Sequence, residues 1–261
     1  MNPKVLVACP TYDGMKYCFE KFSESIKSFD YDNYKILIVD NSDSDDFFGE
    51  LQRDKEIISI KDKSNYPSKL NRLINSRNII LKFAQENKYD FIFMLDADVI
   101  APKETIKELL SQNKDIVSGL YRNYFMVDNK IQIMPVAWMA FTEEEFNEIK
   151  KRYSLPDSVK TRFSMRRYMT EEEVSSNEVL EAFHPSCGCM MISKNVFEKI
   201  RYELHPAQKS STTSDDIGFI ESAKKAGFKI YVDTKIKCNH LVSGKFIKDA
   251  DGNLVHPLAY K

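Results

Sequence analysis

Two carboxylates one residue apart, Asp96 and Asp98, directly follow the apolar run 91–95. The aromatic and β-branched residues of this run predict a buried strand that ends just before the acids. In α/β proteins, ligands bind in the crevice beyond the carboxyl ends of the strands, and carboxylate oxygens suit Mg²⁺ or Mn²⁺. The pair therefore predicts a metal site, although a solvated turn explains so short a pattern equally well.

Polar loops also follow the first two apolar runs of the chain, residues 4–9 and 34–39. If both runs are parallel strands, the two loops lie at the same edge of the sheet, where one ligand can span them. Asp40 stands directly at the end of the second run and could hydrogen-bond a ribose or the edge of a base. The acids at 43–46 are better interpreted as a solvated turn.

Arg77 lies on the apolar side of a helix predicted over residues 68–86. The helical spacing is that of Leu70, Leu73, Ile74, Leu81 and Ala84. A lone arginine in such a place usually packs its stem along the core and extends its charged end to water. Because this helix leads directly into the strand before Asp96, we expect a phosphate or carboxylate partner near those acids.

A second acidic pair, Asp215 and Asp216, begins another predicted helix. Acids in a first helical turn complement the helix dipole, which is the simplest explanation of the pair. The functional alternative is that one of the two carboxylates acts as a general base at the mouth of a crevice. His240 follows the last predicted strand, residues 228–232, and on its own would be interpreted as an isolated surface histidine.

Up to residue 120 the sequence alternates between apolar runs and amphipathic stretches. The apolar runs predict strands at residues 4–9, 34–39, 56–61, 91–95 and 115–120. Helices are predicted over 16–29 and 68–86, and Pro102 opens a third. This order favours an α/β fold with three α/β/α layers, Rossmann-like, with a mostly parallel central sheet. The sequence lacks the G-x-G-x-x-G of a dinucleotide site, which argues against NAD.

The character of the sequence changes at residues 121–181. Residues 142–145 form a capping box that predicts a short helix through about Lys151. Trp138, the only tryptophan, could stack on a sugar or belong to the core, and a basic and aromatic stretch spans 160–168. We interpret this segment as an insertion whose basic residues could grip a phosphate-bearing substrate, although a solvated charge run is the commoner explanation.

The remaining elements complete the predicted sheet. Residues 184–192 predict a buried strand, and Ser193 is expected to cap a helix that continues to Ile200. Gly227 stands where the helix that starts at Ser214 should end.

The composition is that of an ordinary globular protein. The 261 residues include 38 basic and 39 acidic side chains, so the net charge of −1 favours neither nucleic acid nor an anionic membrane. The five cysteines lack zinc-knuckle spacing, which predicts buried, reduced thiols. No apolar run is as long as a membrane span, and the first residues lead into a strand without a signal peptide. We therefore expect one cytoplasmic domain.

Taken in order, these motifs resemble those of the GT-A fold nucleotide-sugar glycosyltransferases, particularly the large inverting family that includes cellulose synthases and bacterial polysaccharide enzymes. The matching motifs are Pro10-Thr11-Tyr12, Val39-Asp40-Asn41-Ser42, Ser76-Arg77-Asn78, Asp96-Ala97-Asp98, Gly188-Cys189-Met190-Met191-Ile192, Ser214-Asp215-Asp216 and His240. The resemblance implies a single nucleotide-diphospho-sugar transferase (GT-A) domain over residues 1–261. Its nucleotide-binding half would be 1–120, the insertion at 121–181 the acceptor region, and 182–261 the acceptor and catalytic half with the tail.

The resemblance also implies roles for individual residues. The nucleotide-sugar, most simply a UDP-sugar, would contact Pro10, Thr11, Tyr12, Asp40, Asn41, Arg77, Asp96, Ala97 and Asp98. A Mn²⁺ or Mg²⁺ ion would be held by Asp98, by Asp96 directly or through water, and by His240. The base would be Asp216 or Asp215, because this chain has Asp-Asp where the family usually has Glu-Asp.

The acceptor implied by the resemblance is a hydroxyl of a saccharide, a lipid-linked molecule or a protein. The chain lacks the Q-x-x-R-W signature and the membrane helices of the polymer-making members, which favours addition of one sugar over processive synthesis. Inversion at the anomeric carbon rests on the resemblance alone.

Three alternatives remain open at this stage. Haloacid dehalogenase phosphatases also begin with D-x-D after a strand, but usually have Thr or Val where this chain has Ile100. Sugar nucleotidyltransferases need a glycine-rich basic loop, which residues 10–14 do not form. A non-catalytic nucleotide or carbohydrate-binding module would have been free to lose the acids and the histidine.

Overall fold

The computed structural model describes residues 2–66, 68–127, 130–185, 187–204, 215–242, 247–248 and 254–255. Ser214 of the predicted base motif and most of the tail after residue 242 lie outside the described residues.

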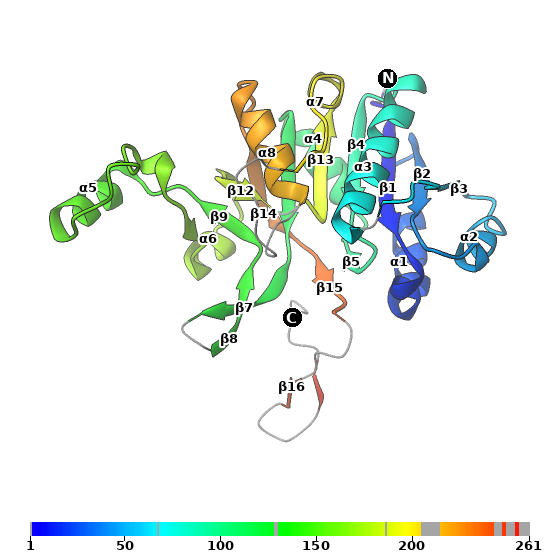
Figure 1. Cartoon of the computed structure of the whole chain (residues 1–261), viewed down its shortest axis with the longest axis horizontal. Helices are drawn as coiled ribbons and strands as arrows, with labels where there is room; N and C mark the ends of the chain where they lie inside the picture. The colour runs from blue at the N-terminus through cyan, green and yellow to red at the C-terminus, as the bar shows by residue number, and fades with distance from the viewer. Residues whose placement is uncertain are drawn as a thin grey trace.

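An eight-stranded sheet forms the centre of the molecule, in the order β11-β14-β6-β13-β4-β1-β2-β3 (Figure 1). The strands are β1 (Val5–Thr11), β2 (Tyr34–Asp40), β3 (Ile57–Lys61), β4 (Phe91–Leu95), β6 (Ile116–Leu120), β11 (Val179–Glu181), β13 (Cys189–Ser193) and β14 (Tyr231–Lys237). The pairings of β11 with β14 and of β13 with β4 and β6 are antiparallel, and the others are parallel. The sheet is therefore mostly parallel, as predicted.

Helices cover both faces of this sheet. They are α1 (Lys16–Lys27), α2 (Asp46–Leu51), α3 (Lys69–Glu86), α4 (Thr105–Ser111), α7 (Lys194–Phe197) and α8 (Asp215–Lys225). Val5, Val7 and Cys9 of β1 share a core with α1, α2 and α4, whereas Leu6 and Ala8 share one with α3, α7 and α8. Alternating side chains of one strand thus contact opposite helix layers, which confirms the three-layer α/β/α fold.

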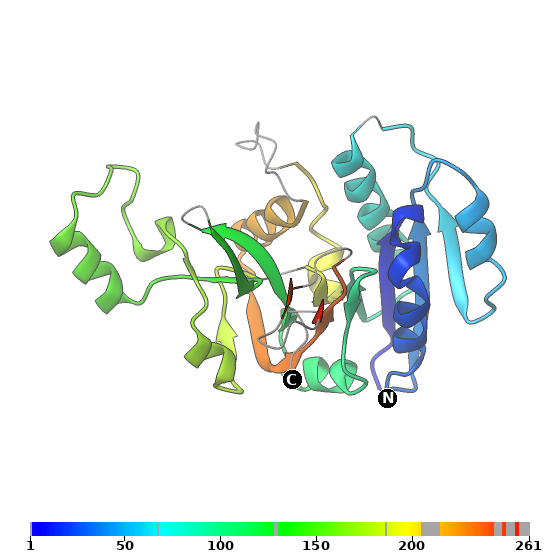
Figure 2. The same cartoon turned by 90° about the horizontal axis from the view of Figure 1, so that it is seen from below.

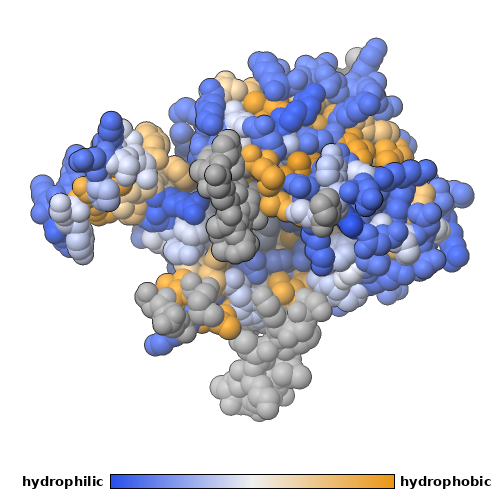
Figure 3. Space-filling model, viewed as in Figure 1, coloured by the Kyte–Doolittle hydropathy of each residue, from blue (hydrophilic) through white to orange (hydrophobic). Residues whose placement is uncertain are grey.

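Apart from β11, the chain between β6 and β13 forms a separate lobe beside the sheet. It contains β7 (Arg122–Val127), β8 (Lys130–Pro135), β9 (Ala137–Met139), α5 (Glu143–Arg152), β10 (Arg167–Tyr168), α6 (Glu171–Ser175) and β12 (His184–Pro185). A small core that includes Met139 and Met169 joins the lobe to Leu120 and Val232 of the main sheet. Helix α5 projects away from the body of the molecule (Figures 1 and 2), and the space-filling view shows the same projection (Figure 3).

Short strand pairs complete the described structure. β5 (Val99–Ile100) pairs with β15 (Asn239–His240), and β16 (Ile247–Lys248) pairs with β17 (Leu254–Val255). All five cysteines are buried and free of disulfides. None of the helices in the described ranges combines the length and apolar character that a membrane crossing requires.

Several predicted elements are confirmed closely. The helix predicted over 68–86 is α3, and the capping box of α5 forms through reciprocal hydrogen bonds between Thr142 and Glu145. Gly227, with a φ of 87°, follows the end of α8 as predicted.

Other predictions were wrong. The single strand expected at 184–192 is two strands in different sheets, because a turn at Cys187 and Gly188 separates β12 from β13. The last strand of the main sheet lies at β14 rather than at 228–232. Helix α7 ends at Phe197 instead of Ile200, and the hydroxyl of Ser193 donates to Asp115 rather than capping that helix.

Candidate active site

A cavity of about 560 Å³ opens at the carboxyl edge of the parallel strands. Every predicted site residue except Asp40 lines it: Pro10, Thr11, Tyr12, Asn41, Arg77, Asp96, Ala97, Asp98, Asp215, Asp216 and His240. These residues come from segments spread over most of the chain, and the sheet brings them together because the loops after β1, β2 and β4 emerge on one edge.

Arg77 lies at the base of this cavity with only 2% of its surface exposed. Its Nη2 atom is 2.9 Å from Oδ1 of Asp96 and 3.9 Å from Oδ1 of Asp216, and its Nε atom pairs with Asp215. The ring of Tyr202 lies 5.4 Å from the guanidinium carbon. Burial disfavours the charged guanidinium, but Asp215 and Asp96 outweigh it and hold the pKa of Arg77 well above its ordinary value.

The two acids at the start of α8 have different surroundings. The side chain of Asp215 is 6% exposed and pairs with Arg77, whereas the side chain of Asp216 is 22% exposed. Burial, and then the charge of Asp215, raise the pKa of Asp216 to about 7, against the opposing effect of Arg77. Asp216 is thus the member of the pair that combines exposure in the cavity with a proton affinity suited to catalysis near neutral pH.

The two D-x-D acids have different partners. Asp96 is held by Arg77, and burial together with Asp98 and Asp215 raises its pKa despite that contact. Asp98 instead faces His240, with 3.3 Å between Oδ2 of the carboxylate and Nε2 of the imidazole. The pairing of β15 with β5 sets His240 opposite Val99, which explains why the two groups meet although they are far apart in sequence.

The hydrogen bond made by His240 fixes which ring nitrogen faces Asp98. Nδ1 lies 3.0 Å from the carbonyl oxygen of Arg122, so Nδ1 carries the proton that is donated there. In the neutral ring the Nε2 lone pair then points toward the Asp98 carboxylate. Burial opposes protonation, but Asp98 more than offsets it and raises the pKa of His240. Either a proton or a cation therefore suits the space between these two groups.

Across the described ranges, no group of three or more His, Cys, Asp or Glu side chains has the arrangement of a metal centre. Mg²⁺ in nucleotide sites is commonly bound by one or two carboxylates together with substrate phosphates and water, rather than by a cage of protein ligands. Asp98 and His240 fit such a site, because one carboxylate and one imidazole would leave positions for the ligand. The same donor pair suits Mn²⁺.

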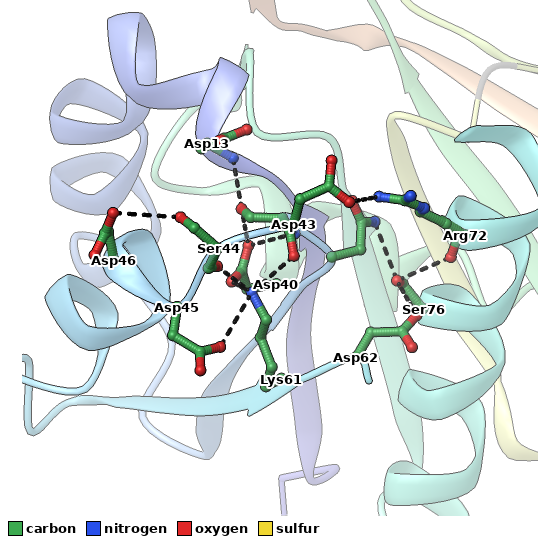
Figure 4. A network of polar contacts seen from close by, with 12 residues as sticks. Asp13, Asp40, Asp43, Ser44, Asp45, Asp46, Lys61, Asp62, Arg72 and Ser76 are labelled. Atoms are coloured by element: carbon green, nitrogen blue, oxygen red, sulfur yellow. Dashed lines mark hydrogen bonds and ion pairs between the residues drawn. The ribbon is translucent and has the colours of Figure 1, made fainter. Parts of the chain in front are cut away.

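Asp40 does not occupy the predicted position in the cavity. It is fully buried, and its Oδ2 atom accepts a hydrogen bond of 2.8 Å from Nζ of Lys61. Its Oδ1 atom accepts from the hydroxyl of Ser42 at 2.5 Å, and that hydroxyl accepts from the backbone N–H of Asp13 at 2.8 Å (Figure 4). Contrary to the prediction of a direct ligand contact, Asp40 is positioned to hold three loops together.

Lys61 explains this difference. It stands in register with Asp40 at the end of the neighbouring strand β3, and it also donates to the carbonyl oxygens of Ser42 and Ser44. A buried carboxylate is stabilised by such a cation, so the pair closes on itself instead of remaining open to a ligand.

The cavity also contains residues that sequence reasoning missed. They are Asp13, Met15, Ser42, Asp43, Lys69, Leu70, Arg72, Leu73, Tyr121 and Asn123. Lys69 precedes Arg77 by two steps of four residues along α3, and this helical spacing could have revealed it. Among the described residues, no carboxylate lies within ion-pairing distance of Lys69, whereas Arg72 pairs with Asp43.

The sequence matches the profile described as Glycosyl transferase family 2 over residues 7–174, which is more than half of the chain. No match was found among curated proteins.

Solved structures of S. aureus TarS have similar folds. TarS 1-349 matches with a TM-score of 0.51 at 15% identity, over 90% of this chain and 60% of that chain. TarS 1-349 in complex with UDP-GlcNAc gives a TM-score of 0.50 at 15% identity, over 94% of this chain and 62% of that chain. This chain thus spans about three fifths of TarS 1-349, and at such identity the similarity concerns the fold.

Replacing the buried arginine should destabilise the protein strongly. Arg77→Met leaves Asp96 and Asp215 buried without their cation, so the free energy of unfolding at pH 7.5 should fall by about 3–5 kcal/mol. The control is Arg72→Met, where the partner Asp43 side chain is 85% exposed and the expected loss is about 0–1 kcal/mol. Denaturant unfolding of the three proteins measures both values.

The stability lost in Arg77→Met should depend on pH. Without Arg77, the nearby carboxyls have folded-state pKa values further above their unfolded values, so stability falls as the pH rises through that range. The loss caused by Arg77→Met should therefore shrink between pH 7.5 and pH 5. An equal loss for both variants, or a greater loss at pH 5, would contradict the assigned role.

Proposed function

The chain belongs to glycosyl transferase family 2, and on that premise we propose that it transfers one sugar from a UDP-sugar to an acceptor hydroxyl with inversion. The observation that supports this most is that Asp98, His240 and Asp216 line one cavity. Arg77 in the same cavity pairs with Asp96 and Asp215. One part of the cavity suits a diphosphate and another suits a proton transfer. The first half of the domain, residues 1–120, would bind the donor. The second half, residues 182–261, would supply the base.

On the donor side, Asp98 and His240 would hold a Mg²⁺ or Mn²⁺ ion, with Asp96 beside them. When bound, the ion would neutralise negative charge on the diphosphate leaving group. The ammonium group of Lys69 is available for the same diphosphate. The backbone N–H of Asn41 donates to the carbonyl oxygen of Thr11 at 2.8 Å, which joins the two loops that would bind the nucleoside.

UDP is the preferred nucleotide for two reasons. The family resemblance favours it, and TarS 1-349, whose fold is similar, has been solved in complex with UDP-GlcNAc. A second cavity of about 310 Å³ shares Asn41, Ser42 and Arg72 with the main one and could receive part of the nucleoside.

On the acceptor side, Asp216 would remove the proton from the attacking hydroxyl. The acceptor oxygen forms a bond to the anomeric carbon, the bond from that carbon to the diphosphate oxygen breaks, and the proton stays on the Asp216 carboxylate. The ion pair with Arg77 holds Asp215 beside Asp216, so Asp215 would not compete with Asp216 for the proton of the acceptor hydroxyl. The phosphatase alternative needs Asp96 as a free nucleophile, and the contact with Arg77 disfavours it.

Nucleotide and metal should stabilise the protein together. We expect UDP with Mn²⁺ to raise the melting temperature more than GDP, CDP, ADP or TDP does. A ligand present at 100 times its Kd adds about 2.7 kcal/mol to the free energy of unfolding, so the nucleotide that binds most tightly gives the largest shift. Asp98→Asn should abolish the shift, whereas Asp32→Asn, at the opposite edge of the sheet, should preserve it. A shift that is independent of Mn²⁺, or that survives in Asp98→Asn, would contradict the proposed donor site.

The rate of UDP release should depend on the ionisation of Asp216. Only the ionised carboxylate accepts a proton, so kcat/KM should fall as the pH is lowered through about 7, the value to which its surroundings raise the pKa of Asp216 in the free protein. Asp216→Asn should lower kcat by about 10²–10⁴-fold and retain stabilisation by UDP and Mn²⁺. Rates measured across a panel of UDP-sugars test this, and full activity of Asp216→Asn would refute it.

A further inference from the structure

Three aromatic side chains of the lobe form one cluster. The rings of Trp138 and Tyr168 lie 4.1 Å apart, and Phe125 lies 5.7 Å from Tyr168 and 6.3 Å from Trp138. Trp138 and Tyr168 are directly opposite each other in the β9–β10 pair, so both side chains stand on the same face. All three residues are half-buried, so the cluster is partly accessible to solvent. Flat aromatic surfaces of this kind suit the C–H face of a sugar ring.

The cluster is continuous with the active-site cavity through strand β7. Asn123 lines the cavity, and Phe125 follows two residues later on the same face of the strand. At roughly 3.4 Å per residue, the two side chains lie about 7 Å apart, which is comparable with the length of one sugar unit. Figures 1 and 2 place β7 and β9 between the main sheet and helix α5. A ligand whose hydroxyl reaches the cavity can therefore extend over the cluster.

Arg166 gives this surface a charge. Its guanidinium carbon lies 4.5 Å from the centre of the Trp138 ring, and the residue is exposed. The four other arginines of the lobe each form an ion pair with a glutamate: Arg122, Arg152, Arg162 and Arg167. In contrast, no carboxylate among the described residues lies within ion-pairing distance of Arg166. The charge of Arg166 is thus available to an anionic ligand.

A buried histidine beside the cluster adds a second unsatisfied group. His184 is opposite Trp138 on strand β12 and is 7% exposed, and its Nδ1 atom lies 3.0 Å from the carbonyl oxygen of Pro185. Its Nε2 atom has no hydrogen-bond partner in the part of the chain that the structure describes. Burial, with Lys224, lowers the pKa of His184 to about 4, so the ring is a neutral acceptor. Buried polar groups without partners are rare in folded proteins.

We propose that Phe125, Trp138, Tyr168 and Arg166 form an acceptor subsite, here called the aromatic platform, that binds an anionic saccharide. The accepting hydroxyl would lie in the cavity near Asp216. A carboxylate or phosphate group about one sugar unit away would contact Arg166. This inference rests on the proposed function and specifies the chemical class of its acceptor.

The single tryptophan provides a direct measurement, because any change in its fluorescence reports on Trp138. Two matched probe pairs are titrated in the presence of UDP and Mn²⁺: trigalacturonic acid against neutral galactotriose, and a phosphorylated maltotriose against maltotriose. We expect at least one anionic probe to bind about tenfold more tightly than its neutral counterpart. The pair that shows the difference identifies the anionic group as carboxylate or phosphate.

Arg166→Gln should remove this preference, with a loss of affinity of about tenfold for the anionic probe. The control is Arg152→Gln, an exposed arginine on α5, which should bind as the parent protein does. Equal binding of anionic and neutral probes, equal losses in the two variants, or no fluorescence change with any probe would each overturn the proposal. We expect UDP and Mn²⁺ to stabilise the protein whether or not Arg166 is present. If they fail to stabilise the parent protein, the proposed function is refuted rather than the aromatic platform.

Discussion

The structure depends most on the compensation of one buried positive charge. An arginine that is 2% exposed is stable only if carboxylates surround it, and Arg77 of α3 obtains them from the loop after β4 and from the start of α8. These segments are far apart in sequence, so the ion pairs fix their relative positions. In each acidic motif, one carboxylate pairs closely with Arg77, and the carboxylates of both motifs line the cavity. On the proposed function, Asp98 would then bind the metal and Asp216 would take the proton.

Much of this arrangement could be predicted from local patterns. Apolar runs located the strands of the first half, helical spacing located α3 almost to the residue, and the order of short motifs indicated the family. The identity of ion-pair partners could not be predicted in this way, because it depends on strand register. Asp40 was expected to contact a ligand, but Lys61, its neighbour across β2 and β3, neutralises it. Likewise, Pro185, Ser186 and Gly188 are turn-forming residue types, but the apolar run after them led to the prediction of a single strand.

The lobe is the part of the molecule that we propose binds the acceptor. It has its own small core, joined to the edge of the main sheet, and its strand β7 carries side chains from the cavity to the aromatic platform. On the proposed function, the main sheet would provide the donor site and the base, while the lobe would present the surface that selects the acceptor. This division would explain why the site acids come from the sheet and its helices, and why Arg166, which has no carboxylate partner among the described residues, comes from the lobe.

The central claim is that Asp98 and His240 bind the metal that accompanies the donor, while Asp96 and Asp215 remain with Arg77. A crystal structure with UDP and Mn²⁺, with anomalous diffraction measured at the manganese edge, tests it most directly. The account predicts one strong peak beside Asp98 and His240, in contact with the diphosphate, with the Arg77 ion pairs intact. A peak between Asp215 and Asp216, or a diphosphate bound by Arg77 in place of its carboxylates, would contradict it.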